Sequence, residues 1–371
     1  MRGPLRVGVV GCGGIAQMMH LPTLAERPDL FSIVALADVN GATLEAVGRR
    51  YAVGGLHLDF RELVSRADVE AVLLLSSGSH EGPAVAALQA GKHVFVEKPL
   101  GFSLEETERI AEVARRSPGR LMVGYHKRFD PAYVKAREEV RALRDLRYVE
   151  VTVLHPDDGA YREHHSLLPL PDRPRTLPDE EESTRAVVRD ATEGPFADCV
   201  TATVGARAPR EHRVGAFLLF QSLVHDVNAL RGILGDPEAV VSAEVWRGGF
   251  AQHSISRFPG DVRVSLSWVF LPGLKHYEER LRFVSPEKRV TLVFPSPYLR
   301  HLPTPLQVER MEGGALVVED RTVSHEEAFR AELHHFRRCL LEGTDPSPSL
   351  DDALGDARWM RAIARAYDAP P

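Results

Sequence analysis

LRVGVVGCGGIA, residues 5–16, decides the fold of the first part of the chain. Its first seven residues are mostly apolar, as in a buried strand, and GCGGIA then matches the pattern G-x-G-x-x-[G/A]. In that pattern the first glycine permits a tight turn, the second lets the backbone approach a pyrophosphate, and the last small residue packs a helix on the strand. The position between a strand and a helix favours this interpretation over a chance glycine turn. The predicted dinucleotide-binding residues of this loop are Gly11, Gly13, Gly14, Ile15 and Ala16.

An acidic residue follows at the end of the second predicted strand, FSIVALAD (31–38). Asp38 lies 22 residues beyond Ala16 (38 minus 16), where a carboxylate receives the ribose hydroxyls of the adenosine. A carboxylate there repels a 2′-phosphate, and the neighbours Val39 and Asn40 bring no positive charge to offset this. We therefore expect NAD as the cofactor and disfavour NADP.

Strand and helix patterns alternate over the first 125 residues. The alternation predicts parallel strands joined by right-handed crossovers, in a sheet covered on both faces. The fold class is therefore α/β, with a doubly wound (Rossmann) domain over residues 1–125. Its predicted strands are 5–11, 31–38, 71–77, 93–99 and 120–126, and its predicted helices are 14–26, 42–51, 82–91 and 103–117.

Residues 126–371 have a different texture and predict an α+β domain with an open, mostly antiparallel sheet. A strand is expected at 147–156, a helix at about 221–234, and mainly strands from 238 to 323. Two helices, 325–342 and 351–367, end the chain and are candidates to pack back on the first domain. The polar, proline-rich segment 155–212 is interpreted as an insertion, either a lid over the substrate or an exposed excursion.

Composition excludes several classes of partner. The net charge of −6 provides no electrostatic attraction for nucleic acid or an anionic membrane. No run approaches the roughly 18–20 apolar residues that span a bilayer. The three cysteines, at 12, 199 and 339, form neither a disulfide framework nor a zinc pattern, so a cytoplasmic protein is expected.

Polar residues follow two of the apolar strands, where ligands bind in doubly wound sheets. Ser76, Ser77 and His80 follow strand 71–77, and HVFVEKP ends in Glu97 and Lys98. All five are predicted cofactor-binding residues. Because Pro99 restricts the backbone of the preceding residue, Lys98 is held at the strand end, where its amine can donate to a substrate hydroxyl or exchange a proton. The alternative is a solvated strand-end lysine.

The segments GCGGIAQMMHLP, LADVN, AGKHVFVEKPLGFS and VGYHKRFDPAY together resemble the glucose–fructose oxidoreductase / inositol dehydrogenase (Gfo/Idh/MocA) family. Their order and approximate spacing match along the N-terminal domain, while the second half matches more weakly in sequence. The resemblance implies NAD(P)-linked oxidation or reduction of a sugar, cyclitol or related polyol. It also implies that Lys98 is catalytic and that the protein associates as a dimer or tetramer.

The family also carries a helical motif, D-x-G-x-H-x-x-D, whose histidine is the usual acid/base. The matching segment here is QSLVHDVN, residues 221–228, in which the histidine is His225 and both acids are amides, Gln221 and Asn228. In a regular helix these three side chains share one face, whereas Asp226 points away from it. The resemblance makes His225 catalytic, with Gln221 and Asn228 in contact with substrate. Without a carboxylate beside it, we expect the imidazole to stay neutral more readily and to act as base. A buried structural histidine is the alternative.

Three further residues are candidates for substrate binding by the same resemblance: Lys127 and Arg128 in YHKRFDP, and His155 at the end of strand 147–156. A surface salt bridge is the alternative for the first two. His155, His164 and His165 fit no standard metal signature, and no metal is expected.

The leading prediction is an NAD-dependent enzyme that moves hydride between the nicotinamide and a hydroxyl or keto carbon, with proton transfer by His225 assisted by Lys98. Two alternatives stay open: a hydrolase or epimerase that uses bound NAD transiently, and a non-catalytic NAD-bound regulator or partner protein on the same scaffold.

Overall fold

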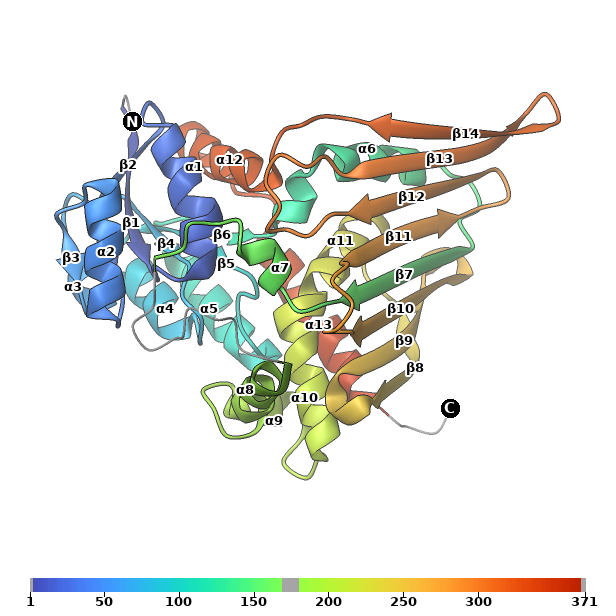
Figure 1. The fold of residues 1–371 in the computed structure, drawn as a ribbon, viewed down its shortest axis with the longest axis horizontal. Helices are drawn as coiled ribbons and strands as arrows, with labels where there is room; N and C mark the ends of the chain where they lie inside the picture. The colour runs from blue at the N-terminus through green and yellow to red at the C-terminus, as the bar shows by residue number, and fades with distance from the viewer. Residues whose placement is uncertain (1–2, 169–179, 368–371) are drawn as a thin grey trace. The chain divides into compact units, whose positions relative to one another are not determined.

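The computed structural model describes residues 3–168 and 180–367 (Figure 1). The chain forms two compact units. The first contains the described residues of Met1–Tyr125, Glu163–Ser183 and Phe329–Leu354, and the second those of His126–Arg162, Thr184–Ala328 and Gly355–Pro371.

The first unit is built on a six-stranded sheet in the order β3-β2-β1-β4-β5-β6, in which every pair of neighbours is parallel. This strand order is that of the dinucleotide-binding Rossmann fold, which confirms the predicted fold class. The strands are β1 Leu5–Val10, β2 Phe31–Ala37, β3 Leu56–His57, β4 Ala71–Leu74, β5 His93–Glu97 and β6 Leu121–Gly124. The helical elements are η1 Ala16–His20, α1 Leu21–Glu26, α2 Gly41–Tyr51, α3 Phe60–Ser65, α4 Glu81–Gln89, α5 Leu104–Arg116 and α12 Ala328–Glu342.

Two details of this unit differ from the sequence-based expectation. The short elements β3 and α3 were not predicted, because two and six residues carry too little periodicity. The predicted helix 14–26 begins as the π-helix η1 and becomes α-helical only at Leu21. Pro22 provides a physical reason: it lacks the N–H that would bond the carbonyl of Met18 in an α-helix.

The second unit contains an eight-stranded sheet in the order β14-β13-β12-β11-β7-β10-β9-β8. Within this sheet only β7 and β10 pair in parallel among its described strands, so the sheet is mostly antiparallel, as predicted. Its strands are β7 Tyr148–His155, β8 Ala239–Trp246, β9 Ala251–Phe258, β10 Val262–Phe270, β11 Glu278–Val284, β12 Lys288–Phe294, β13 Pro305–Glu312 and β14 Ala315–Thr322. β13 was missed within the region where strands were expected.

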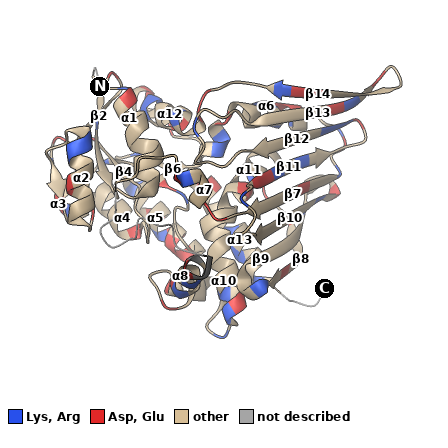
Figure 2. Ribbon diagram, in the orientation of Figure 1, with Lys and Arg blue, Asp and Glu red and all other residues tan. Residues whose placement is uncertain are grey.

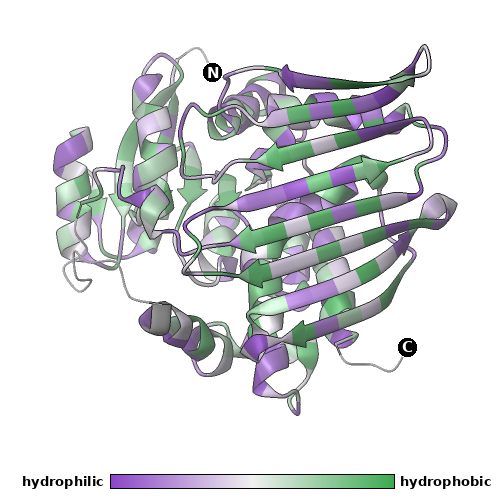
Figure 3. Ribbon diagram, turned by 45° about the vertical axis from the view of Figure 1, so that its right-hand side comes forward, coloured by the Kyte–Doolittle hydropathy of each residue, from purple (hydrophilic) through white to green (hydrophobic). Residues whose placement is uncertain are grey.

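The helical elements of this unit include α6 and α11, which lie along one face of the sheet (Figures 1 and 3). Along β10, buried Val262, Val264, Leu266 and Trp268 alternate with more exposed residues, and Figure 3 shows the same alternation across the sheet. Charged residues of both signs are interspersed on strands and helices (Figure 2). The elements are η2 His126–Phe129, α6 Pro131–Arg141, α7 Gly159–Arg162, α8 Glu180–Thr192, α9 Ala197–Val204, α10 Arg210–Leu218, η3 Leu219–Leu223, α11 Val224–Leu234, η4 Arg247–Gly249, η5 Pro259–Asp261 and α13 Leu350–Arg365, which is divided between the units after Leu354.

The predicted insertion 155–212 is largely helical where it is described. It contains α7, α8, α9 and the start of α10. Pro195 precedes the N-cap of α9, and Pro209 is the N-cap of α10; proline is tolerated at both positions. These prolines therefore mark helix boundaries. Residues 169–179 of this segment lie outside the described part. None of the described helices has the length and apolarity needed to cross a membrane.

Candidate functional site

The glycine loop after β1 has the geometry that a dinucleotide requires. Gly11 has a φ of +94°, and a Cβ built on it would lie 2.4 Å from the backbone nitrogen of Ser76. Only glycine fits there. A Cβ on Gly13 would instead meet no atom within 4 Å, so this residue faces open space. The two glycines thus fit a tight turn and an open approach for a pyrophosphate, respectively.

Asp38 follows β2 and holds the glycine loop. Its carboxylate accepts hydrogen bonds from the backbone N–H of Cys12 (2.7 Å) and of Asn40 (2.8 Å). The pKa of the Cys12 thiol is raised to about 12 by burial and by the negative charge of Asp38, so the thiol is protonated at neutral pH. The carboxylate therefore lies beside the loop that the sequence assigned to the cofactor.

The loop after β4 and the turn after β5 are tied together by His80. Its Nδ1 faces the carbonyl oxygen of Pro99 at 2.9 Å, and its Nε2 faces that of Ser76 at 3.0 Å. His80 is buried, and both ring nitrogens are used by backbone. His80 thus bridges the two turns, and its contact with the cofactor stays a prediction. Ser76 is half-buried and Ser77 is exposed beside the glycine loop.

Lys98 directly follows β5 and is half-buried, and its peptide bond to Pro99 is cis. The preceding Glu97 points into the protein. Its Oε1 lies 2.6 Å from Nε2 of His20, and its Oε2 accepts a hydrogen bond from the backbone N–H of Lys98 at 3.1 Å. Since only 9% of the Glu97 side chain is exposed, its predicted contact with the cofactor is not supported by this placement.

A third titratable side chain, Glu332 of α12, joins this pair. One ligand atom each from His20, Glu97 and Glu332 lie within 4.8 Å of one another, all in the interior of the first unit. Neither carboxyl oxygen of Glu332 has a hydrogen-bond partner. Burial and the charge of Glu97 raise the pKa of Glu332 well above its ordinary value.

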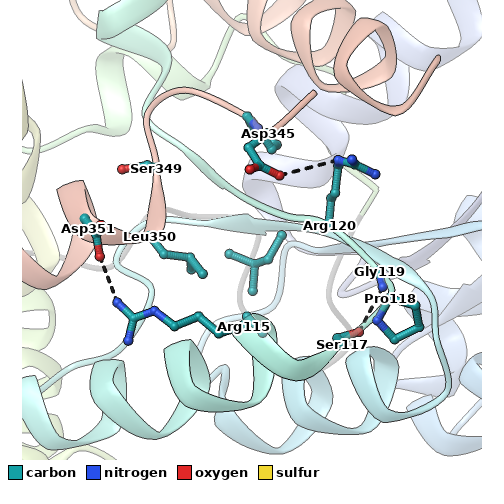
Figure 4. A pocket seen from close by; sticks show the side chains of 12 residues that line it. Arg115, Ser117, Pro118, Gly119, Arg120, Asp345, Ser349, Leu350 and Asp351 are labelled. Atoms are coloured by element: carbon teal, nitrogen blue, oxygen red, sulfur yellow. Dashed lines mark hydrogen bonds and ion pairs between the residues drawn. The ribbon is translucent and has the colours of Figure 1, made fainter. Parts of the chain in front are cut away.

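A pocket of about 430 Å³ lies at the opposite, amino-terminal edge of the same sheet, next to the start of β6 (Figure 4). It is lined by the end of α5, by the turn between α5 and β6, and by residues before and at the start of α13. Its two arginines already have carboxylate partners: Arg115 pairs with Asp351, and Arg120 with Asp345. This pocket is separate from the strand ends that carry Asp38 and Lys98.

In the second unit, His225 lies near the start of α11 and is half-buried. Its ring centroid is 4.9 Å from that of His126, in an edge-on arrangement. The expected common face of residues 221, 225 and 228 is not retained: Gln221 is exposed, whereas the buried Asn228 amide donates to Asp356. The π-helix η3, which ends just before α11, changes the rotation per residue and explains the difference. The substrate contact predicted for Asn228 is therefore not supported.

Asp226, which the motif did not assign, belongs to a buried charged cluster. Lys127 forms a buried salt bridge with Glu279, and the Tyr277 hydroxyl donates to the same carboxylate. Burial and the charge of Glu279 raise the pKa of Asp226 well above its ordinary value. Burial also works to raise the pKa of Glu279, but the charge of Lys127 and hydrogen bonds outweigh it and hold that pKa below its ordinary value.

The remaining predicted substrate residues have protein partners. Lys127 forms a buried salt bridge with Glu279. This favours the alternative of a salt bridge over substrate binding, but the salt bridge lies in the interior and not at the surface. Arg128 donates to the backbone carbonyl of Asn228 at 2.9 Å. His155 is half-buried among aromatic side chains, with ring centroids of Trp268 and Tyr277 at 5.8 and 5.6 Å.

Sequence reasoning missed His20, Glu332 and Glu279. A signal existed for two of them: a charged residue at an inward-facing position. Glu279 lies on the same face of β11 as the buried Leu281 and Phe283. Glu332 lies on the apolar face of α12, among the buried residues of that helix, Phe329, Leu333 and Phe336. Such positions rarely carry a charge unless it has a partner.

The fold and the loop define a dinucleotide-binding protein: a parallel sheet in Rossmann order, with glycines at the first turn and an acid after the second strand. Residues 5–125 match the family described as an oxidoreductase family with an NAD-binding Rossmann fold, Gfo/Idh/MocA. This match confirms the resemblance to the family that the motifs of the first part indicated.

Curated relatives match over little more than a third of the chain. The chain is 38% identical over 137 residues to inositol 2-dehydrogenase/D-chiro-inositol 3-dehydrogenase of Shouchella clausii, covering 36% of this chain and 39% of that protein. It is 40% identical over 139 residues to inositol 2-dehydrogenase of Agrobacterium fabrum, covering 37% and 41%. The matched part thus spans about two fifths of the length of these relatives.

Solved structures share the fold over nearly the whole chain. The 3-ketoreductase KijD10 from Actinomadura kijaniata, in complex with TDP-benzene and NADP, is similar with a TM-score of 0.71 and 20% identity, covering 98% of each chain. Aldose–aldose oxidoreductase from Caulobacter crescentus has a TM-score of 0.73 and 20% identity, covering 98% of this chain and 97% of that one.

Proposed function

We propose that the protein is an NAD-dependent oxidoreductase that acts on a CH–OH or keto carbon of a sugar, cyclitol or related polyol. One observation carries the proposal. Gly11, Asp38, Ser76 and Lys98 follow β1, β2, β4 and β5 of one parallel sheet and so share its carboxyl-terminal edge. At that edge such sheets bind their ligands. The family match over residues 5–125 and the similarity to inositol dehydrogenases support a polyol as substrate.

The dinucleotide would be held by the loop Gly11 to Ala16 and by Ser76, Ser77 and Asp38. The fit rests on the positive φ of Gly11 and the open space at Gly13. When bound, the nicotinamide accepts or supplies the hydride. The protein's own part is to orient the substrate and to move a proton.

Lys98 and His225 are the proposed proton-handling residues. The Lys98 ammonium donates a hydrogen bond to the reacting oxygen, and this interaction strengthens as negative charge develops there. His225 accepts the hydroxyl proton during oxidation and returns it during reduction. Gln221, exposed near His225 in sequence, is retained as a candidate substrate contact, together with His155, whose aromatic neighbours limit its motion.

NAD is proposed over NADP because Asp38 is the charged group beside the glycine loop. Its carboxylate is held by two backbone N–H groups, so it cannot swing away from a 2′-phosphate without breaking both bonds. The use of NADP by a structural neighbour such as KijD10 describes that protein. We also propose a homo-oligomer in the cytoplasm, a compartment that fits cysteines 12, 199 and 339, which form no disulfide.

The test is a spectrophotometric screen at 340 nm with NAD and with NADP. The panel contains myo-inositol, D-chiro-inositol, aldoses and their keto forms, and substrate consumption is followed separately. We expect NAD reduction by at least one polyol and loss of turnover by about 10²–10⁴-fold in Lys98→Met, with NAD affinity unchanged. Lys135→Met, which removes an exposed lysine paired with Glu138, is the matched control.

The same screen separates the alternatives. Consumption of substrate without net NADH would favour a hydrolase or epimerase that uses bound NAD transiently. Tight NAD binding with no substrate consumed by any member of the panel would favour a regulatory or partner protein. Normal turnover in Lys98→Met would refute the assigned role of that lysine.

A further inference from the structure

The turn that carries Lys98 adjoins a cluster of three buried titratable side chains: His20 from η1, Glu97 from β5 and Glu332 from α12. We refer to these three as the buried triad. His20 and Glu332 are fully buried and Glu97 nearly so. All three belong to the first unit, and the hydride-transfer chemistry proposed above does not use them.

The geometry connects the buried triad to Lys98 through Glu97. One carboxylate oxygen of Glu97 accepts the backbone N–H of Lys98 at 3.1 Å, while the other lies 2.6 Å from Nε2 of His20. The His20 ring is itself held edge-on by Phe95 and Phe329, with centroids 5.5 Å away in each case. Glu97 therefore cannot turn outward without losing both hydrogen bonds.

We propose that Glu97 is a positioning residue for Lys98, and that His20 and Glu332 complete a proton-sharing unit that keeps Glu97 in place. The proposal rests on the catalytic role of Lys98 proposed above. It gives the buried triad a function that the fold alone does not require, since a buried site of this kind could be filled by apolar side chains.

The burial of the triad limits how many of its acids can be ionised. Two ionised carboxylates beside a neutral imidazole would leave two negative charges in the interior, which is strongly unfavourable. A proton kept by Glu332 leaves Glu97 as the one carboxylate beside the His20 ring. The 2.6 Å separation of Nε2 and Oε1 fits a short hydrogen bond from the His20 N–H to the Glu97 carboxylate.

Glu332 is the neutral member. Its carboxyl oxygens are buried without a hydrogen-bond partner, as expected for an acid that has kept its proton. In the part of the chain that the structure describes, the titratable groups that face it are Glu97 from β5 and His20 from η1. Burial and the charge of Glu97 raise its pKa, which agrees with this assignment.

The first test compares Glu97→Leu, Glu97→Gln and Glu332→Gln with a structural control, Leu333→Ala, which removes a buried side chain next to Glu332 on α12. We expect Glu97→Leu to lower kcat on the order of tenfold to a hundredfold, with the Kd of NAD unchanged. Glu97→Gln restores part of kcat because its amide oxygen can still accept the Lys98 N–H. Leu333→Ala lowers Tm but not kcat.

The second readout does not need turnover. Competitive acetylation with acetic anhydride, followed by mass spectrometry, reports the reactivity of the Lys98 amine against the other lysines as a function of pH. We expect Glu97→Leu to change the Lys98 profile, and Leu333→Ala and Glu332→Gln to leave it unchanged. An unchanged profile together with an unchanged kcat in Glu97→Leu would overturn the proposal even if Lys98→Met is inactive.

The third readout is stability against pH. Because folded Glu332 holds its proton more tightly than the unfolded chain does, the stability it contributes is lost as pH rises above its ordinary pKa. Glutamine does not titrate, so the Tm of Glu332→Gln minus that of the native protein should increase with pH from about pH 5 upward. A constant difference would refute the neutral state of Glu332. A different outcome is that the purified protein contains stoichiometric metal, which Glu332→Gln loses. The buried triad would then be a metal site, and the proposed proton-sharing unit would be wrong.

Discussion

At the scale of single residues, the predicted functional side chains fall into two groups. Gly11, Gly13, Asp38 and Lys98 occupy the positions that their motifs require. Others, including Glu97, His80 and Lys127, are turned inward and bound by protein groups. A motif specifies where the backbone runs, but the direction of a polar side chain depends on partners from distant segments.

Asp38 is the residue on which the proposed preference for NAD rests. We expect the native protein to bind NAD more tightly than NADP, and Asp38→Ser to weaken NAD binding by about tenfold while narrowing that preference. The loss follows from removing a charged acceptor of the ribose hydroxyls, and the narrowing from removing the repulsion of the 2′-phosphate. Titration calorimetry with both dinucleotides measures the two effects. Tighter NADP than NAD binding by the native protein would contradict this assignment.

At the scale of elements, the glycine loop contains one residue that we expect to determine stability and another that we expect to determine cofactor binding. Gly11→Ala should lower stability by at least about 1–2 kcal/mol, because alanine disfavours the positive φ and its Cβ would clash with the Ser76 backbone. Gly13→Ala should fold normally, since its Cβ meets no atom within 4 Å, yet it should weaken NAD binding. Denaturant unfolding and NAD titration of both variants test this contrast. Equal stability of the two would show that the turn does not depend on Gly11.

The packing of η2, α11 and β11 contains a second buried set of charges: Lys127, Glu279 and Asp226. Glu279→Gln leaves Lys127 buried without its counter-charge and should destabilise by about 3–5 kcal/mol at neutral pH. Asp226→Asn replaces an acid that is already neutral when folded and should cost far less.

The pH dependence of these two variants differs in sign. The pKa of Asp226 is raised on folding, so the stability it contributes is lost as pH rises above its ordinary value, and Asp226→Asn should gain relative stability with pH. The pKa of Glu279 is lowered, so its contribution is lost as pH falls below its ordinary value. Urea unfolding between pH 4 and 8 measures both, and parallel curves would contradict the assigned protonation states.

At the scale of the whole molecule, each of the two units contains one predicted catalytic residue next to a buried charged cluster. Lys98 follows Glu97 of the buried triad, and His225 precedes Asp226. In each cluster one basic side chain and two acids lie in the interior. Burial and the neighbouring carboxylate raise the pKa of the second acid in each, Glu332 or Asp226, which single-residue motifs do not reveal.

Local patterns were sufficient for β1, β2, β4, β5 and β6 of the first unit, because short apolar runs bounded by glycine, proline and polar residues have few alternative structures. They were insufficient for β3, β13 and the helices of 155–212, where the pattern is short or polar. The π-helix before α11 was also not foreseen, and it changed which side chains accompany His225.

The sequence by itself determined the dinucleotide-binding domain, its family and the strand ends that carry Asp38 and Lys98, because glycine conformation and strand periodicity are local properties. Only the tertiary structure decided that Glu97 faces His20 and Glu332, and that Asp226 faces Glu279. Those contacts join segments far apart in the chain, and the charge of each buried acid depends on desolvation and on a partner that no local pattern names.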